Sequence, residues 1–370
     1  MQRFGIITTV GLGLLLLLAC SSTTETKIPP QNTREPASFL LSEPGPYYAG
    51  NLEYTLIDDS RNGREIKLLI WYPALKQTDA DGQAIVRDAM PDMSNAPYPL
   101  ILTEEDSGRD LFMSHLATHG FVMIVVKSSL SLEDGGKNVF QVARDFLFSL
   151  EQISQNPPDG LKKVMDTDQV GVTGYSYGGD GALAVSGARV DPEFYLSQCD
   201  NISSLAPEAV QLIYKDYYCQ DASNWDEFVT FMGDEITRSD NGLWQPLTDE
   251  RIRAVMPMAP TVSWFYGELG LASVDRPTLL IWGTKDVVSP YSLEAEYTFE
   301  HLIIPDRYLI SFINWDHTLP ASTYGALRIK HFATAFFGYY LQGRKDYIEY
   351  LSEEFVSQFD GLAWGAYSDK

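Results

Sequence analysis

The spacing of apolar and polar positions changes several times along the chain, and each change predicts an element. Two strand-like runs come first, and the Asn62-Gly63 pair between them is typical of a β-hairpin turn. Later apolar runs are short and nearly continuous, as in buried parallel strands. The expected strands are 51–59, 64–75, 98–104, 121–129, 169–176, 251–260, 276–284 and 306–313. Helical spacing lies between them, over 109–120, 137–154, 177–189, 289–302 and 322–341, with a helical tail over 345–359. This alternation predicts an α/β fold with a mostly parallel central sheet and helices on both faces.

Residues 191–250 break the alternation. They are rich in aromatic and acidic residues, contain helical runs such as "WDEFVTFMGDEI", and show no buried strand. We interpret them as a helical lid inserted after the helix at 177–189. Their aromatic side chains either form an apolar pocket for a ligand or pack the core of the lid, and the sequence leaves both readings open. These residues are Tyr214, Tyr217, Tyr218, Trp225 and Trp244.

The N-terminus has the pattern of an export signal. One arginine precedes a short apolar run that ends in Leu17-Leu18-Ala19-Cys20, and this run is too short for a comfortable membrane-spanning helix. The ending resembles a bacterial lipobox, in which Cys20 is lipidated; the alternative is an ordinary signal peptide with an incidental cysteine. Ser21, rather than aspartate, follows Cys20 and favours the outer membrane over the inner one. We therefore expect a signal peptide over 1–19, a polar tether over 20–46 and a domain over 47–370, anchored in the bacterial envelope.

The composition of the chain limits the kinds of partner that the protein is expected to bind. The chain has 370 residues, 45% of them hydrophobic, which suits one large domain. The formal net charge is −23 and no basic patch stands out, so nucleic acid is not an expected partner. After removal of the signal peptide and lipidation of Cys20, two thiols remain, Cys199 and Cys219. In an oxidising compartment they are expected to form a disulfide, the alternative being two buried free thiols.

The stretch "VTGYSYGGDG" carries the candidate nucleophile. Gly174-Tyr175-Ser176-Tyr177-Gly178 follows a predicted buried strand and precedes a predicted helix, which is the setting of a nucleophile elbow. A serine in such a tight turn leaves room only for small residues two positions before and after it. The turn lifts the hydroxyl toward a histidine, and the following helix places its positive end where negative charge develops. The alternative is a glycine-rich packing corner.

A serine nucleophile needs a base and an acid that orients the base, in the chain order Ser, Asp or Glu, His. Asp286 follows the strand predicted at 276–284, whereas Asp275 and Asp306 precede strands and are weaker candidates for the acid. His317 lies in a loop after a strand and downstream of Asp286, so it is the expected base. The other histidines lie on or at the ends of predicted helices; His115 and His119 are four residues apart, but we read them as a helix face and not as a metal site.

Five segments together resemble a known family. They are "IKLLIWYPA", "GYSYGG", "RIRAVMPMAP", "PTLLIWGTKDVVSP" and "NWDHT", and the likeness covers most of residues 47–340. They resemble the dienelactone-hydrolase-like branch of the α/β-hydrolase superfamily, and within it the bacterial lipoprotein esterases related to platelet-activating-factor acetylhydrolases. The resemblance implies an α/β-hydrolase fold with Ser176, Asp286 and His317 as the triad. It also implies that the backbone amides of Tyr177 and Ser107 bind the oxyanion.

The chain departs from that family at one place. Where the family carries a His-Gly pair after the strand at 98–104, this chain reads "EEDSG", residues 104–108. Carboxylates close to a developing oxyanion oppose its charge.

Taken together, the predicted triad and the resemblance predict a carboxylic-ester hydrolase that needs no cofactor and no metal and acts on a small-molecule ester. The alternatives are a binding lipoprotein that keeps the fold without activity, and an acyltransferase or peptidase with the same triad.

Overall fold

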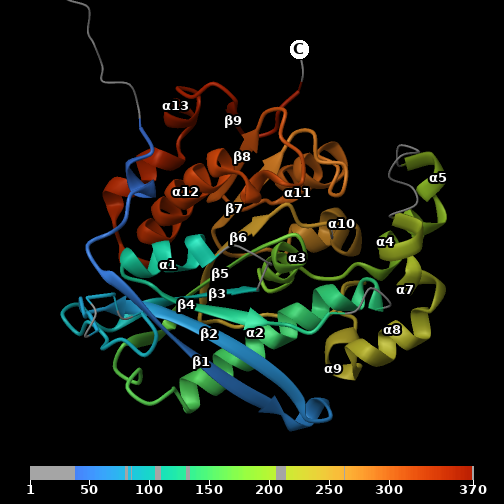
Figure 1. Cartoon of the computed structure of the whole chain (residues 1–370). Helices are drawn as coiled ribbons and strands as arrows, with labels where there is room; N and C mark the ends of the chain where they lie inside the picture. Colours follow the sequence, from blue (N-terminus) through green and yellow to red (C-terminus); the bar gives the residue numbers. More distant parts are fainter. Residues whose placement is uncertain are drawn as a thin grey trace, which may run out of the picture. The chain divides into compact units, whose positions relative to one another are not determined.

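A mostly parallel sheet forms the centre of the protein (Figure 1). The computed structural model describes residues 38–79, 82–84, 86–104, 110–130, 134–205, 214–261 and 263–368. Within these residues the sheet has nine strands in the order β1-β2-β4-β3-β5-β6-β7-β8-β9. Their bounds are β1 Tyr48–Asp58, β2 Arg64–Ala74, β3 Tyr98–Glu104, β4 Val122–Lys127, β5 Met165–Tyr175, β6 Ile252–Met258, β7 Thr278–Gly283, β8 Arg307–Phe312 and β9 Leu362–Trp364. The α/β class with a mostly parallel sheet is thus confirmed.

Strand directions set where a site can form. The strands from β4 across to β8 pair in parallel, while β1 pairs antiparallel with β2, β2 with β4, and β9 with β8. The chain places β4 on one side of β3 and then β5 on the other, so the direction of winding changes between β3 and β5. Ligands of open α/β sheets bind outside the carboxyl ends of the strands at such a switch point. Glu104 and Tyr175 end these two strands.

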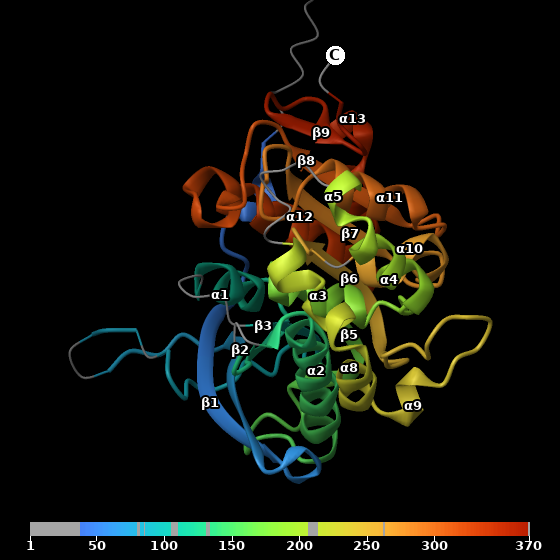
Figure 2. The same cartoon turned by 90° about the vertical axis from the view of Figure 1, so that its right-hand side faces the viewer.

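Helices cover both faces of the sheet. The pair α1 (Asp110–Thr118) and α12 (Thr323–Gln342) packs on one face, whereas α2 (Lys137–Gln155), α3 (Tyr177–Ala184), α10 (Ser263–Leu271) and α11 (Tyr297–His301) pack on the other (Figure 2). Shorter helical turns complete the set: η1 Leu40–Ser42, η2 Asp59–Arg61, η5 Ser292–Glu296, η6 Leu319–Ala321, η7 Lys345–Leu351 and α13 Glu353–Val356. Alternate residues of each strand point to opposite faces, so a core forms on each side of the sheet.

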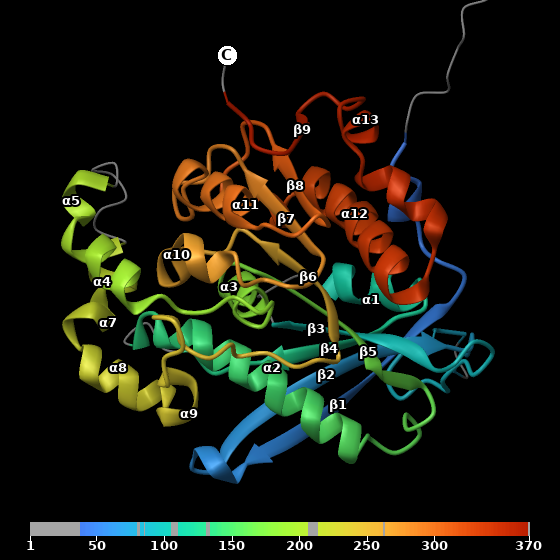
Figure 3. The same ribbon diagram turned by 180° about the vertical axis from the view of Figure 1, so that it is seen from behind.

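The predicted lid is a run of short helices at one side of the molecule (Figures 1 and 3). These are α4 Pro192–Asp200, α5 Ile202–Leu205, η4 Tyr214–Tyr218, α7 Gln220–Ser223, α8 Trp225–Met232 and α9 Asp234–Thr237. The sequence predicted one helix over 225–236, but Gly233, with a φ of 77°, divides it into α8 and α9. Cys199 and Cys219 lie at disulfide distance, 2.04 Å between the sulfur atoms, and join α4 to the start of α7.

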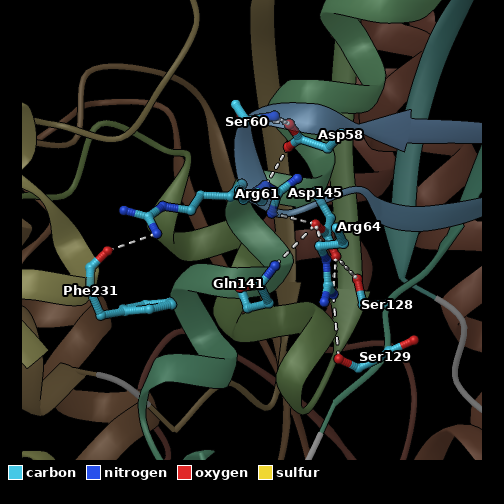
Figure 4. A network of polar contacts seen from close by, with 10 residues as sticks. Asp58, Ser60, Arg61, Arg64, Ser128, Ser129, Gln141, Asp145 and Phe231 are labelled. Atoms are coloured by element: carbon cyan, nitrogen blue, oxygen red, sulfur yellow. Dashed lines mark hydrogen bonds and ion pairs between the residues drawn. The ribbon is translucent and has the colours of Figure 1, made fainter.

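A buried ion network ties the β1–β2 hairpin to α2 (Figure 4). The Asp145 side chain has no exposed surface and accepts hydrogen bonds from Arg61 Nη1 at 2.7 Å, Arg64 Nη2 at 2.7 Å and Ser128 Oγ at 2.9 Å. Arg61 is shared with Asp58 of the hairpin turn. A buried carboxylate is tolerated only when such partners replace its water, so this network fixes the hairpin against the helix.

The folded part begins before residue 47, the boundary predicted for it. Phe39 stacks on Phe359 with ring centroids 4.1 Å apart, and the Leu41 amide donates to His331 Nδ1 at 3.1 Å. The tether predicted over 20–46 therefore includes residues that pack against α12. The signal peptide and Cys20 lie outside the described residues. Among the residues that the structure describes, no helix has the length and apolar character needed to cross a membrane.

Candidate active site

Ser176 sits in a strained turn between β5 and α3. Its φ of 55° and ψ of −118° lie in a region that non-glycine residues rarely occupy. Two backbone hydrogen bonds hold it there: the Ser176 amide donates to the Met258 carbonyl at 3.0 Å, and the Asp180 amide donates to the Ser176 carbonyl at 2.8 Å. Strain that is held this firmly is typical of functional residues, and the hydroxyl of Ser176 here contacts His317.

Close backbone approach explains the glycines of the motif. A Cβ on Gly174 would lie 2.3 Å from the carbonyl carbon of Gly178. A Cβ on Gly178 would lie 3.0 Å from the Cβ of Glu104, at the end of β3. The turn therefore needs glycine at 174, and side-chain space at 178 is already filled by Glu104. This matches the expectation that only small residues fit on either side of the serine.

The structure brings Ser176, His317 and Asp286 together as a hydrogen-bonded chain. His317 Nε2 lies 3.1 Å from Ser176 Oγ, and His317 Nδ1 lies 2.7 Å from Asp286 Oδ2. The histidine is 141 positions from the serine and 31 positions from the aspartate along the sequence. The three residues meet because each follows a strand end, of β5, β8 and β7 respectively. Both distances are within hydrogen-bonding range for a nucleophile, a base and the group that orients the base.

Asp286 is held rigidly. Its side chain has no exposed surface, and Oδ1 accepts the amides of Val288 at 2.9 Å and Ser289 at 2.8 Å. Oδ2 is left to accept from His317. The weaker candidate Asp275 has a side chain that is 69% exposed and pairs with Arg276, so it takes no part in the site.

The loop that carries His317 docks on β7. The Lys285 amide donates to the Trp315 carbonyl at 2.8 Å, and a Cβ on Gly283 would lie 2.3 Å from that same oxygen. The imidazole packs beside the ring of Tyr175, with centroids 4.9 Å apart. No sequence pattern assigned a role to Tyr175, although its place directly before the serine could have suggested one.

A cavity of about 310 Å³ opens next to the serine turn. Most of its lining is apolar and includes Phe112, Met113, Met258 and Leu327, while Lys330 of α12 adds a charged group. Glu104 and Tyr175 also line it, so it begins where the nucleophile turn meets the end of β3. This volume lies at the small end of the range of ligand-binding pockets.

The aromatic residues of the lid lie elsewhere. Tyr214, Tyr218 and Trp244 are buried, and Trp225 stacks on Trp244 with centroids 5.3 Å apart. They pack the lid against the domain and do not line the cavity beside the serine. Of the two readings that the sequence left open, the structure favours packing for these four residues. The side chain of Tyr217 lies outside the described part of the chain.

The remaining predicted residues lie as follows. Tyr177 is the first residue of α3, so its amide lies at the helix start directly after the serine. Ser107 and the acidic residues Glu105 and Asp106 lie outside the described residues. His115 Nε2 is within hydrogen-bonding distance of the Leu41 carbonyl and the Thr334 hydroxyl, and His119 Nε2 contacts the Glu43 carbonyl. The described residues contain no cluster of metal-ligating groups.

No protein-family model matches the chain, and the search of curated proteins finds no matching protein.

Proposed function

We propose that this protein is a serine hydrolase that cleaves carboxylic esters and has an α/β-hydrolase fold. The single observation that carries the proposal is the chain of hydrogen bonds from Ser176 through His317 to Asp286, with the serine in a strained turn. The resemblance noted in the sequence supports the same assignment. So does the position of the three residues at the carboxyl ends of β5, β7 and β8.

The chemistry follows from these contacts. Ser176 Oγ attacks the ester carbonyl while His317 Nε2 takes its proton, and Asp286 holds the imidazole with its Nδ1 proton toward the carboxylate. The carbonyl oxygen gains negative charge, and the Tyr177 amide at the start of α3 is expected to donate to it. His317 then gives its proton to the leaving alcohol, and an acyl-enzyme forms. Water, deprotonated by His317, releases the acid and restores the serine.

The cavity supports a substrate with an apolar part. Phe112, Met113 and Met258 line it with apolar surface, whereas Glu104 and Lys330 are charged residues of the same lining; burying each additional methylene of a substrate against the apolar part gains about 0.8 kcal/mol. We therefore expect esters with short to medium apolar chains to be cleaved best. The proposed location is the bacterial envelope, through lipidation of Cys20; Cys20→Ser should release the protein from the membrane fraction, and unchanged fractionation would count against the anchor.

The test of the proposal is active-site labelling. The purified protein should react with a fluorophosphonate at Ser176 and hydrolyse nitrophenyl esters, and Ser176→Ala should lose both, with activity falling by about 10³-fold or more. A folded wild-type protein that neither labels nor turns over, beside a control esterase that does both, would point to a binding lipoprotein instead.

A further inference from the structure

One short segment contacts both the nucleophile turn and the loop of the catalytic acid. It begins at Met258, the last residue of β6, and we call residues 258–261 and 263 the post-β6 segment. The carbonyl of its first residue, Met258, accepts the amide of Ser176 at 3.0 Å. The carbonyl of Pro260 accepts the hydroxyl of Ser289 at 2.5 Å, and Ser289 is a residue whose amide donates to Asp286 Oδ1. The position of this segment therefore affects the positions of both Ser176 and Asp286.

The segment also contacts the nucleophile helix. The carboxyl group of Asp180, on α3, accepts both the amide and the hydroxyl of Thr261, the hydroxyl at 3.1 Å. Asp180 is fully buried, and burial raises its pKa well above the usual range. Ala259, in the same segment, has a φ of 43°, which is unusual for a residue with a Cβ. A strained backbone persists only where surrounding contacts hold it in place.

Glu294 fixes the far end of the segment. It is fully buried on η5, and its Oε2 accepts the amide of Ser263 at 3.1 Å and the hydroxyl of the same residue. Its other oxygen, Oε1, accepts the hydroxyl of Tyr214 at 2.6 Å. Burial raises the pKa of Glu294 to about 7, and the charge of Asp286 contributes in the same direction. No basic side chain of the described residues forms an ion pair with Glu294, so these three donors are what replaces its water.

Tyr214 belongs to the lid. Its ring packs on Trp264 with centroids 4.3 Å apart, and its carbonyl accepts the amide of Cys219 at 2.7 Å. Cys219 is one of the two cysteines at disulfide distance. The hydroxyl of Tyr214 is therefore a polar link between the cysteine-bearing part of the lid and the segment behind the triad.

We propose that Glu294 and Tyr214 are positioning residues for the triad: together they fix the post-β6 segment, and through it the relative placement of Ser176 and Asp286. This inference rests on the proposed function. Neither residue lines the cavity beside the serine, so neither contacts the substrate there. Loss of either should lower the rate of the chemical steps and leave substrate binding almost unchanged.

Tyr214→Phe is the cleanest variant, because it removes one hydroxyl and keeps the ring on Trp264. Tyr195→Phe is its matched control. Tyr195 is a fully buried lid tyrosine whose hydroxyl donates to the Tyr218 carbonyl at 2.6 Å, accepts the Ala222 amide at 3.1 Å and has no bond to Glu294. Tyr195→Phe breaks two buried hydrogen bonds and Tyr214→Phe breaks one, so the control should lower the temperature of unfolding at least as much.

The expected results distinguish an effect on the placement of the triad residues from an effect on the stability of the fold. Tyr214→Phe should lower kcat on the order of tenfold, because one buried hydrogen bond to a carboxyl group is lost. KM should stay within about twofold, and Tyr195→Phe should keep the wild-type kcat. Glu294→Ala should cost on the order of 10²-fold in kcat by misplacing the triad. Glu294→Gln, whose amide oxygen can still accept the amide and hydroxyl of Ser263 while its NH2 group donates to the Tyr214 hydroxyl, should recover part of that loss.

The measurements are kcat and KM on one nitrophenyl ester, the rate of fluorophosphonate labelling and thermal unfolding, all on the full folded domain. If Tyr214→Phe matches Tyr195→Phe in kcat, or if its loss is entirely in KM, the positioning role is wrong. A wild-type protein without labelling or turnover overturns the proposed function itself, and that result is distinguishable because it needs no variant.

Discussion

Replacement of Asp286 by asparagine tests the triad, and the hydrogen bonds of Asp286 predict how far kcat should fall. In the native site Oδ1 accepts two backbone amides, from Val288 and Ser289, and Oδ2 accepts from His317 Nδ1. An asparagine has one oxygen and one NH2 group in place of the two equivalent oxygens. The single oxygen of asparagine can face either the two backbone amides or the imidazole, but not both. The two backbone donors therefore compete with the imidazole for this oxygen.

We expect the amide oxygen of the introduced asparagine to face the two backbone donors. If the amide oxygen faces Val288 and Ser289, both of their bonds survive; the opposite orientation would set an NH2 group against two amides and lose about 1–3 kcal/mol in hydrogen bonds. The NH2 group of the introduced asparagine then donates to His317 Nδ1. This stabilises the tautomer with the proton on Nε2, which lies 3.1 Å from Ser176 Oγ and can no longer accept the serine proton.

The expected result of Asp286→Asn is a fall in kcat of about 10⁴-fold, equivalent to about 5.5 kcal/mol in the barrier, with the fold retained. The assay is hydrolysis of a nitrophenyl ester together with the rate of fluorophosphonate labelling. Asp275→Asn is the control, since Asp275 is exposed and lies outside the site. If Asp286→Asn keeps more than about one-tenth of the wild-type kcat, Asp286 does not set the tautomer and the reasoning from its hydrogen bonds is refuted.

Three further predictions concern the rest of the molecule. Asp145→Ala should lower the free energy of unfolding by about 3–5 kcal/mol, because it leaves the arginines of the hairpin network without their buried partner; a urea titration with a change below about 1 kcal/mol would contradict this. Cys199 and Cys219 should resist alkylation until a reductant is added, and rapid labelling of the native protein would argue against a bridge. Burial raises the pKa of Glu294 from 4.5 to about 7, so folding favours its protonated form; this contribution is fully present below pH 4.5 and should be lost as the pH rises to 7, by about 3 kcal/mol. Glu294→Gln should flatten the stability curve over that interval, and an unchanged slope would show that another group is responsible.

The frame of the fold could be predicted because apolar runs and helical spacing are local signals. Buried strands such as β4 and β7 are nearly continuous apolar runs, and the predicted hairpin is β1 and β2 paired along their whole length. The helix α10 was missed for the opposite reason. Its sequence, "SWFYGELGL", is buried on almost every side, so it shows no helical period, and Gly267 bends it at a φ of 57°.

Two further elements differ from the prediction. The helix expected over 177–189 ends at Ala184, shortly before Gly187, which has a φ of 98°. The short strand β9 lies just after the helical tail expected over 345–359, at a place where the sequence predicted no element. Three residues are too few to show a strand pattern, and β9 exists only because β8 offers it an edge.

The candidate site also contains some residues that a local sequence pattern predicts and others that only the tertiary structure identifies. Ser176 was predictable because the backbone of a tight turn imposes glycines at fixed spacing, and His317 and Asp286 because chain order and strand ends favour them over the other candidates. Nothing in the sequence distinguishes Asp180 and Glu294 from the many acidic residues on solvent-facing helix surfaces. What sets them apart is that both are fully buried, a property of the tertiary structure and not of any local pattern.

This difference has a physical consequence for how the site works. In the proposed hydrolase the triad residues supply the reacting groups, and the rate depends on distances that the side chains themselves do not determine. We propose that those distances are set by the post-β6 segment, which bonds to Ser176, to α3 and to the loop of Asp286. Two buried carboxyl groups hold that backbone, and in a nonpolar interior each is tolerated only while its donors stay in place. Any change that removes one donor therefore acts on the geometry of the triad as well as on the stability of the fold.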